Sequence, residues 1–282
     1  MIAIGQYNDL RIIKKTEEGL ILTEGEKEVI LPYIDVPAAA EIGDNLNVFV
    51  FMQKDGRLQA TTKKPLACVG DFAYLTVVDE TEDGGAFMNI GLGKDIYVPK
   101  REQKRPMFKG DKHVVYVFLD ESNDRMLASS KLLNFVEEED IDLEEGDEVS
   151  LLIVDRSDMG YNAIIDNKYI GLLYTNELFD ELNPGETRKG WIKKIRVEGK
   201  IDLSLQSMGY GHILETKDVL LEELKDSGGV IALGDKSSPE DIYQRFKISK
   251  SAFKKAIGGL YKDRLITVTD HEIRILVDHE AE

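Results

Sequence analysis

The chain has 282 residues, a net charge of −17 and 42% hydrophobic residues, which is enough for packed cores in more than one domain. It contains no apolar run of the roughly 18 residues that span a bilayer, and its start lacks the pattern of a signal peptide. The single cysteine, Cys68, excludes an intrachain disulfide, so we expect a cytoplasmic protein that does not bind membranes.

The negative charge is unevenly distributed, which matters because nucleic acid binding depends on basic residues. Residues 135–209 contain 8 basic and 18 acidic side chains, whereas residues 66–134 contain 9 and 11. The run "EEEDIDLEEGDE", from Glu137 to Glu148, is typical of a solvated connector. Local patches, and not the net charge, therefore decide which partner the protein can bind.

A glycine-led segment of alternating apolar and polar residues occurs three times. The copies are "GLILTEGEKEVILP" from residue 19, "GAFMNIGLGKDIYVP" from residue 85 and "GYNAIIDNKYIGLLY" from residue 160. A glycine–acid pair follows 24 or 25 residues after each first glycine, and then come an apolar strand, a basic residue and a short closing strand. The repetition predicts three β units of about 65 residues each.

Such units can bury their apolar side by closing into five-stranded barrels, which also removes exposed sheet edges. We therefore predict a mostly β protein with a C-terminal α+β domain. The barrels are expected at residues 1–65, 66–134 and 135–209, and the last domain at residues 210–282.

Residues 210–282 predict three helices followed by a hairpin at Asp270 and His271. Ser238 and Ser249 are the expected N-caps of the second and third helices. This order of elements resembles a winged-helix domain. The residues expected on the helical stripes are Val219, Leu220, Leu224, Phe253, Ile257, Leu260 and Tyr261.

The repeated unit resembles the S1 RNA-binding domain, an OB-fold barrel. The third unit has Gly-Leu-Leu-Tyr at residues 171–174 and the closing Leu-Ser-Leu at residues 203–205. The second unit has Gly-Ala-Phe at residues 85–87. Three S1-like barrels followed by a winged helix resemble the bacterial conserved virulence factor B family over nearly the whole chain. The resemblance implies an RNA-binding regulatory protein without a catalytic centre.

OB barrels bind single strands on their second and third strands, where aromatic rings stack on bases. The resemblance places the stacking aromatic at Phe87 and the family's histidine position at Tyr174. Strand alternation directs Phe87 outward, because its neighbours Ala86 and Met88 suit the interior.

The other aromatic candidates are less regular. Tyr97 aligns with Leu172, so we interpret it as a core residue, and the third unit has Asn162 at the position of Phe87, with Tyr161 beside it. No unit contains the complete set of stacking residues. We therefore expect one site shared across units, with Tyr161 as a further RNA-binding candidate.

Basic residues near this face are candidates for phosphate contacts. Arg57, Arg125 and Lys200 occupy the same position before each closing strand, where the S1 family commonly has arginine. Two further clusters are interpreted as RNA-binding, although basic side chains also cover apolar surface with their stems. Their members are Lys100, Arg101, Lys104, Arg105, Lys109 and Lys112 in the second unit, and Arg188, Lys189, Lys193, Lys194, Arg196 and Lys200 in the third.

The predicted third helix of the winged helix contains Lys250, Lys254 and Lys255. Lysines attract phosphates, whereas base readout usually needs Arg, Asn or Gln. We therefore expect backbone contact or protein contact there, and DNA binding through this helix stays an alternative.

Nothing in the chain indicates catalysis or a bound metal. The four histidines lack metal-ligand spacing, a single cysteine excludes the Cys-rich zinc sites, and "GLGK" at Gly91–Lys94 lacks the spacing of a P-loop. We predict no enzyme activity and no cofactor. The sequence favours a protein that binds single-stranded RNA to control gene expression; the alternatives are a winged-helix transcription regulator and a protein-interaction scaffold.

Overall fold

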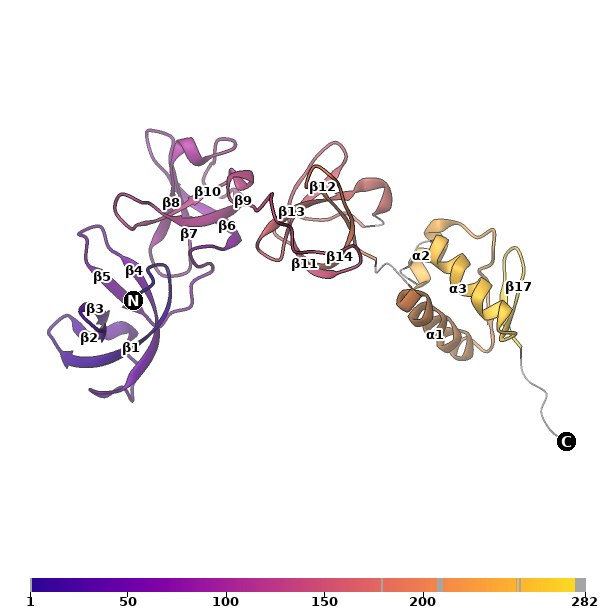
Figure 1. Ribbon diagram of the computed structural model, residues 1–282, viewed down its shortest axis with the longest axis horizontal. Coiled ribbons are helices and arrows are strands. Elements are labelled where there is room, and N and C mark those ends of the chain that lie inside the picture. Colours follow the sequence, from indigo (N-terminus) through magenta and orange to yellow (C-terminus); the bar gives the residue numbers. More distant parts are fainter. Residues whose placement is uncertain (1, 179, 207–209, 247, 249, 277–282) are drawn as a thin grey trace.

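A computed structural model describes the fold of residues 2–178, 180–206, 210–246, 248 and 250–276. Three closed five-stranded barrels and a C-terminal domain with helices and a small sheet follow one another along an arch, with barrel 1 and the C-terminal domain at its ends (Figure 1). This arrangement confirms the predicted fold class. The predicted division after residues 65, 134 and 209 stays a prediction, and Ser249 lies outside the described residues.

Barrel 1 closes in the strand order β1-β2-β3-β5-β4. Its core consists of the alternate residues of each strand, including Leu10, Leu22 and Val50. Strands β2 and β3 are the first copy of the repeated segment, and Gly19 lies opposite Pro32. The elements are β1 (Gln6–Lys15), β2 (Gly19–Glu24), β3 (Lys27–Pro32), η1 (Tyr33–Asp35), β4 (Asn45–Met52) and β5 (Leu58–Thr61).

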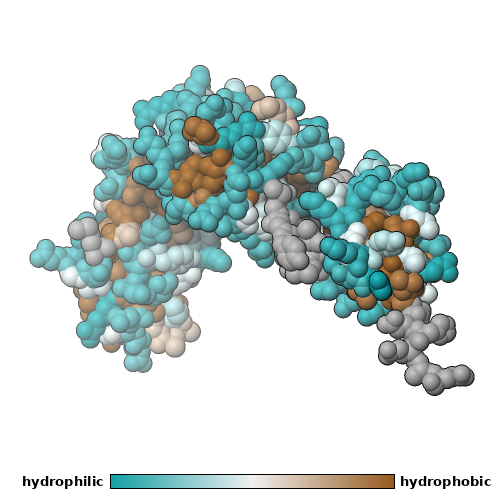
Figure 2. All heavy atoms as spheres, turned by 45° about the vertical axis from the view of Figure 1, so that its right-hand side comes forward, coloured by the Kyte–Doolittle hydropathy of each residue, from teal (hydrophilic) through white to brown (hydrophobic). Residues whose placement is uncertain are grey.

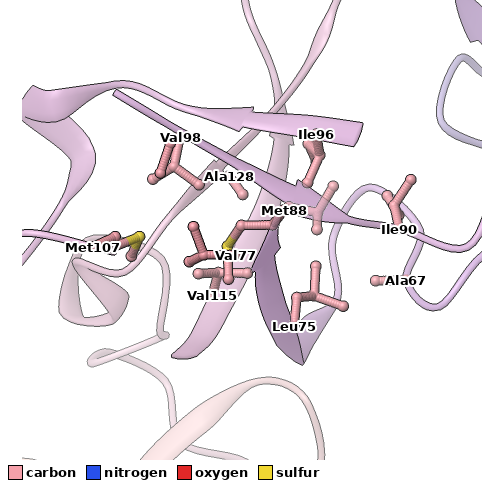
Figure 3. Packing of buried hydrophobic residues seen from close by; sticks show 12 residues of the cluster. Ala67, Leu75, Val77, Met88, Ile90, Ile96, Val98, Met107, Val115 and Ala128 are labelled. Carbon is pink, nitrogen blue, oxygen red and sulfur yellow. The ribbon is translucent and has the colours of Figure 1, made fainter. Parts of the chain in front are cut away.

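Barrel 2 repeats this order as β6-β7-β8-β10-β9. Leu75, Val77, Met88, Ile96 and Val115 converge in its interior (Figure 3). Strands β7 and β8 are the second copy of the repeat. The elements are β6 (Phe72–Glu80), β7 (Ala86–Asn89), β8 (Asp95–Val98), η2 (Lys100–Glu102), β9 (Lys112–Leu119), β10 (Met126–Ser129) and η3 (Leu132–Asn134).

Barrel 3 has the order β11-β12-β13-β15-β14. Its core includes Leu151, Ile153, Tyr169 and Leu203. Strands β12 and β13 are the third copy of the repeat. The elements are β11 (Glu148–Arg156), β12 (Gly160–Ile165), β13 (Tyr169–Tyr174), η4 (Thr175–Glu177), β14 (Thr187–Ile195) and β15 (Ile201–Ser204).

The repeated glycine–acid pairs form one type of turn at five places. In each turn the glycine has a φ between +84° and +102°, and its N–H donates to a strand carbonyl. The N–H of that same strand residue donates to the carbonyl of the acid, and the acid side chain accepts an N–H three residues earlier. The turn therefore fixes where a strand begins. The pairs are Gly43-Asp44, Gly70-Asp71, Gly110-Asp111, Gly146-Asp147 and Gly185-Glu186.

Replacing Gly146 by alanine tests this role of the turn. Its φ is +101° and a Cβ there would meet nothing within 4 Å, so backbone strain is the main cost. Strain of this kind costs about 1–3 kcal/mol. We expect the G146A variant to lower the free energy of unfolding of barrel 3 by that amount in urea titrations. An unchanged unfolding midpoint would contradict this role of the glycine.

Barrels 2 and 3 share an apolar contact. Ile164 on the outer face of β12 is 1% exposed and packs with Phe72, Val114 and Leu132. At the tip of the β12–β13 hairpin, the Asn167 Oδ1 accepts the Phe72 N–H at 2.7 Å, and its Nδ2 donates to the Gly70 carbonyl at 2.9 Å. Barrel 2 therefore covers the hairpin-tip end of the outer face of β12 and β13.

The C-terminal domain packs three helices against a sheet in the order β16-β18-β17. Ser238 caps the second helix as predicted, since its Oγ accepts the Asp241 N–H at 3.1 Å. Two predicted stripe residues are wrong: Val219 is 53% exposed and Tyr261 is 60% exposed, because both lie at the edge of their stripes. The elements are α1 (Tyr210–Asp226), β16 (Val230–Ile231), α2 (Pro239–Phe246), α3 (Lys250–Lys262), β17 (Ile266–Val268) and β18 (Ile273–Ile275).

Candidate nucleic-acid interface

One pair of outward positions on the repeated hairpin differs between the barrels. The two residues lie directly opposite each other on the second and third strands, and both are half-buried on the outer face. Barrel 2 is the barrel in which both positions are aromatic. The pairs are Ile21 and Ile30 in barrel 1, Phe87 and Tyr97 in barrel 2, and Asn162 and Leu172 in barrel 3.

The rings of Phe87 and Tyr97 form a small aromatic platform, with centroids 5.1 Å apart and an angle of 45° between the rings. The flanking Ala86 and Met88 are completely buried, which confirms the outward placement of Phe87. The Tyr97 ring lies over Gly85, where a Cβ would come within 2.2 Å of the Tyr97 Oη. The glycine that opens the repeat therefore makes room for the second ring.

The interpretation of Tyr97 as a core residue is wrong. Its neighbours Ile96 and Val98 are 3% and 0% exposed, so alternation turns Tyr97 to the outside with Phe87. Leu172, with which it aligns, is also half-buried on the outer face and not in the core. The alternation within β8 is the sequence signal that identifies Tyr97 correctly.

Two cations lie on the 3₁₀ helix η2, which directly follows the strand β8 that carries Tyr97. The Lys100 side chain passes over Gly84, where a Cβ would be 3.2 Å from its Cδ. The Arg101 side chain is 81% exposed, and its Nε lies 3.8 Å from the Glu102 carboxylate. Gln103 anchors the segment because its Nε2 donates to the carbonyls of Gly84 and Val98 at 3.0 and 3.2 Å.

The other basic residues between η2 and β9 contact different parts of the protein. The Lys104 Nζ lies 3.0 Å from Asp155 of barrel 3, so it links two barrels. Arg105 and Lys109 are exposed, and the Lys109 N–H donates to the Glu80 carboxylate at 2.8 Å. Burial and the nearby charge of Arg105 lower the pKa of His113. Within the part of the chain that the structure describes, no hydrogen bond or ion pair joins these residues to the aromatic platform.

Tyr161 does not belong to the interface. It is 5% exposed and packs in the core of barrel 3, with Arg156 5.8 Å from its ring centroid. The prediction that it stacks on RNA is therefore corrected. Asn162 is the outward residue, because alternation places neighbours on opposite faces, and its Nδ2 donates to Asp155 at 2.8 Å.

Tyr174 lies on the outer face of barrel 3 within a charged network. The Arg196 Nη2 donates to the Tyr174 Oη at 2.5 Å and to the Asp202 Oδ2 at 2.9 Å. The Arg196 Nε also donates to that oxygen, at 3.0 Å, and these bonds raise the pKa of Arg196. The guanidinium is thus occupied by a buried carboxylate, which reduces its availability to phosphate.

Other cations of barrel 3 are also neutralised by acids. Lys189 pairs with Glu148 at 2.6 Å, Lys200 pairs with Glu198 at 3.2 Å, and Lys193 pairs with Glu177. Lys194 is exposed, and no acid partner is found for it among the described residues. Together with the excess of acids in this unit, these pairs make barrel 3 a poor phosphate surface.

The basic residues before the closing strands have the same position but different partners. Arg57 pairs with Asp55 at 2.7 Å and with Glu18 at 2.9 Å. Arg125 donates to the Lys54 carbonyl of barrel 1 at 2.6 Å. The shared position therefore does not give the three barrels an equivalent phosphate contact.

The third helix of the C-terminal domain presents lysines to the surface. Lys254 pairs with Asp235 at 2.9 Å, Lys255 is exposed and Lys250 is half-buried. In the space-filling view the visible face is mostly hydrophilic, with hydrophobic patches in the middle of the arch and on the C-terminal domain (Figure 2). Within the described residues, no helix could span a membrane and no cluster of three His, Cys, Asp or Glu could hold a metal ion.

The barrels and the C-terminal domain define the class of this chain as tandem S1-type domains followed by a winged helix. Residues 4–63 match the S1 domain family, and residues 218–275 match the CvfB-like winged helix domain family. Neither is a family of enzymes. The chain belongs to the conserved virulence factor B family.

Relatives extend along most of the chain. The uncharacterized protein YitL of Bacillus subtilis is 30% identical over 268 residues, which are 92% of this chain and 89% of the relative. Conserved virulence factor B of Staphylococcus saprophyticus is 24% identical over 83% of this chain and 81% of its own. A crystal structure of a multidomain protein with nucleic acid binding domains from Streptococcus pneumoniae has a TM-score of 0.40 and 22% identity, covering 97% of this chain and 98% of its own.

Proposed function

We propose that this protein binds single-stranded RNA on the outer face of barrel 2 and controls gene expression by binding transcripts. The observation that carries the proposal is the Phe87–Tyr97 platform, which lies on the second and third strands, where OB barrels bind single strands. The match of the chain to the S1 and winged-helix families supports binding of a nucleic acid.

The chemistry of the platform favours bases of any identity. Each base has a π-face, so stacking contributes about 1–3 kcal/mol per base with little sequence preference. Lys100 and Arg101 follow the strand that carries Tyr97 and would supply positive charge for the phosphates that connect the stacked bases. Further weak contacts on the winged helix, through Lys250, Lys254 and Lys255, would raise avidity by effective concentration.

The experiment that tests the proposal is a fluorescence-anisotropy titration at several salt concentrations. The probes are one labelled single-stranded RNA, the single-stranded DNA of the same sequence and a duplex DNA. We expect the RNA to bind more tightly than the duplex, with affinity falling as salt rises. A preference for one duplex sequence would select a DNA-binding regulator instead, and no RNA binding at low salt would select a protein-interaction scaffold. Both results contradict the proposal.

A double K100A/R101A variant is expected to weaken RNA binding and flatten its salt dependence. Each lost contact with a single-strand phosphate removes about 0.7 from the slope of log affinity against log salt, so two contacts remove about 1.4. The matched control is K189A, since Lys189 is already paired with Glu148. Equal slopes for the double variant, the control and the unmodified protein would remove η2 from the interface.

A further inference from the structure

The junction between barrels 1 and 2 brings together three cations from three turns. Lys54 lies in the β4–β5 turn of barrel 1, Lys94 precedes β8 and Arg125 precedes β10. Arg125 donates to the Lys54 carbonyl at 2.6 Å, and the Lys94 Nζ lies 3.5 Å from the centre of the Phe51 ring in barrel 1. The side chains of barrel 2 therefore reach across to barrel 1.

The two barrels are held together at this junction by backbone contacts. The Val69 N–H donates to the Gly5 carbonyl at 2.9 Å, and the Gln6 side chain donates to the Val69 carbonyl. A Cβ on Gly5 would come within 2.1 Å of Val69, so the segments pack without a gap. The three cations therefore lie at a closely packed contact between barrels 1 and 2.

Nearby acids do not neutralise this group. Within the described residues no ion pair is found for Lys54, Lys94 or Arg125, and the closest acid in the β4–β5 turn, Asp55, pairs with Arg57 at 2.7 Å. Desolvation and the positive charges of Arg125 and Lys54 together lower the pKa of Lys94 to about 8. The positive charges of Lys54, Lys94 and Arg125 repel one another. Because a bound anion would relieve this repulsion, their placement together in a chain with a net charge of −17 indicates an anion site.

We propose that Lys54, Lys94 and Arg125 form a phosphate site that binds the backbone of a polynucleotide where it passes between barrels 1 and 2. This inference rests on the proposed function, because it names how the strand that stacks on barrel 2 continues onto barrel 1. Ammonium and guanidinium groups are the usual phosphate ligands, and contacts to the backbone position a strand without reading its sequence. The site lies on turns and includes no residue of the aromatic platform.

The test uses variants of the full chain that remove charge and keep the side-chain stem. Lys94→Met and Arg125→Met are compared with Lys27→Met, an exposed lysine at the start of β3 in the corresponding barrel 1 hairpin. We expect each junction variant to weaken single-stranded RNA binding about five- to tenfold and to lower the salt slope by about 0.7, with no change for Lys27→Met. Thermal unfolding of the same samples shows whether barrel contacts persist.

The pH dependence gives a second readout. As pH rises from 7 to 9, Lys94 loses its proton around its pKa of about 8, so RNA affinity is expected to fall. Lys54, Arg125 and the Phe51 ring are the groups found facing Lys94. The Lys94→Arg variant keeps its charge over this range and is expected to flatten the profile. A profile identical to that of the unmodified protein would contradict a role for Lys94.

A third measurement separates failure of this site from failure of the proposed function. NMR titration of the Lys94 side chain reports its pKa in chloride, in inorganic phosphate at equal ionic strength and with the RNA. A higher pKa of Lys94 with RNA than in chloride supports the proposal. RNA binding that is equal in all variants overturns the junction site and leaves the proposed function intact. If the pKa of Lys94 rises with inorganic phosphate and the protein does not bind RNA, the polynucleotide assignment and the proposed function are both overturned.

Discussion

The F87A/Y97A double variant is expected to bind single-stranded RNA at least about thirtyfold more weakly than the unmodified protein. Two stacked bases contribute about 2–6 kcal/mol, and every 1.4 kcal/mol corresponds to about a tenfold change in affinity. The salt slope should stay unchanged, because the variant removes rings and no charges. Fluorescence anisotropy with the same RNA probe measures both quantities.

Matched variants separate ring stacking from general loss of apolar surface. Y97F keeps the ring and is expected to bind RNA like the unmodified protein, whereas F87L keeps apolar area without a ring and is expected to bind more weakly. I30A changes the position in barrel 1 that corresponds to Tyr97 and serves as the control. If the double variant binds as tightly as I30A while remaining folded, barrel 2 is not the stacking site.

The largest structural effect is expected for I164D, which places a carboxylate in the contact between barrels 2 and 3. Ile164 is 1% exposed among Phe72, Val114 and Leu132. Losing its burial and introducing an unpaired charge should destabilise the contact by about 3–5 kcal/mol. The cores of both barrels remain, because Ala163 and Ile165 fill barrel 3 while Ile164 points outward.

Hydrogen exchange measures this separation directly. The Phe72 amide donates to the Asn167 side chain across the contact, so its protection should fall in I164D while core amides of β12 stay protected. I164V is the control, with an expected cost of about 0.5–1.5 kcal/mol. Unchanged protection of the Phe72 amide in I164D would show that the contact does not hold the barrels together.

Much of the fold could be predicted because its signals are local and repeated. The glycine–acid pairs each form the same turn, and the hairpins of barrels 1 and 3 place their first glycine opposite the last residue of the next strand. Alternation also assigned Phe87 to the outer face. The same rule within β8 places Tyr97 on the outer face, whereas its alignment with Leu172 predicts a core position only if Leu172 faces inward. Leu172 itself faces outward, so that prediction is wrong.

The availability of basic residues to phosphate could not be predicted in this way, because the sequence does not reveal which side chain each cation contacts. Arg196 stands in a basic segment, yet the fold joins it to Asp202 and to Tyr174, which is 22 residues away in the chain. Lys94 belongs to a segment that lacks P-loop spacing, yet the packing of barrels places it on Phe51. The contacts of Arg196 with Tyr174 and of Lys94 with Phe51 depend on distances between segments that are far apart in sequence.

The sequence by itself determined the strands, the turns and the order of the domains, because each follows from the alternation or backbone freedom of adjacent residues. Only the tertiary structure decided which cations remain unpaired, that barrel 2 covers part of the outer face of barrel 3, and that two rings meet on barrel 2. Those features arise where closed barrels touch and where strands pair across a sheet. Packing between distant segments, and not local pattern, therefore selects the surface available to a ligand.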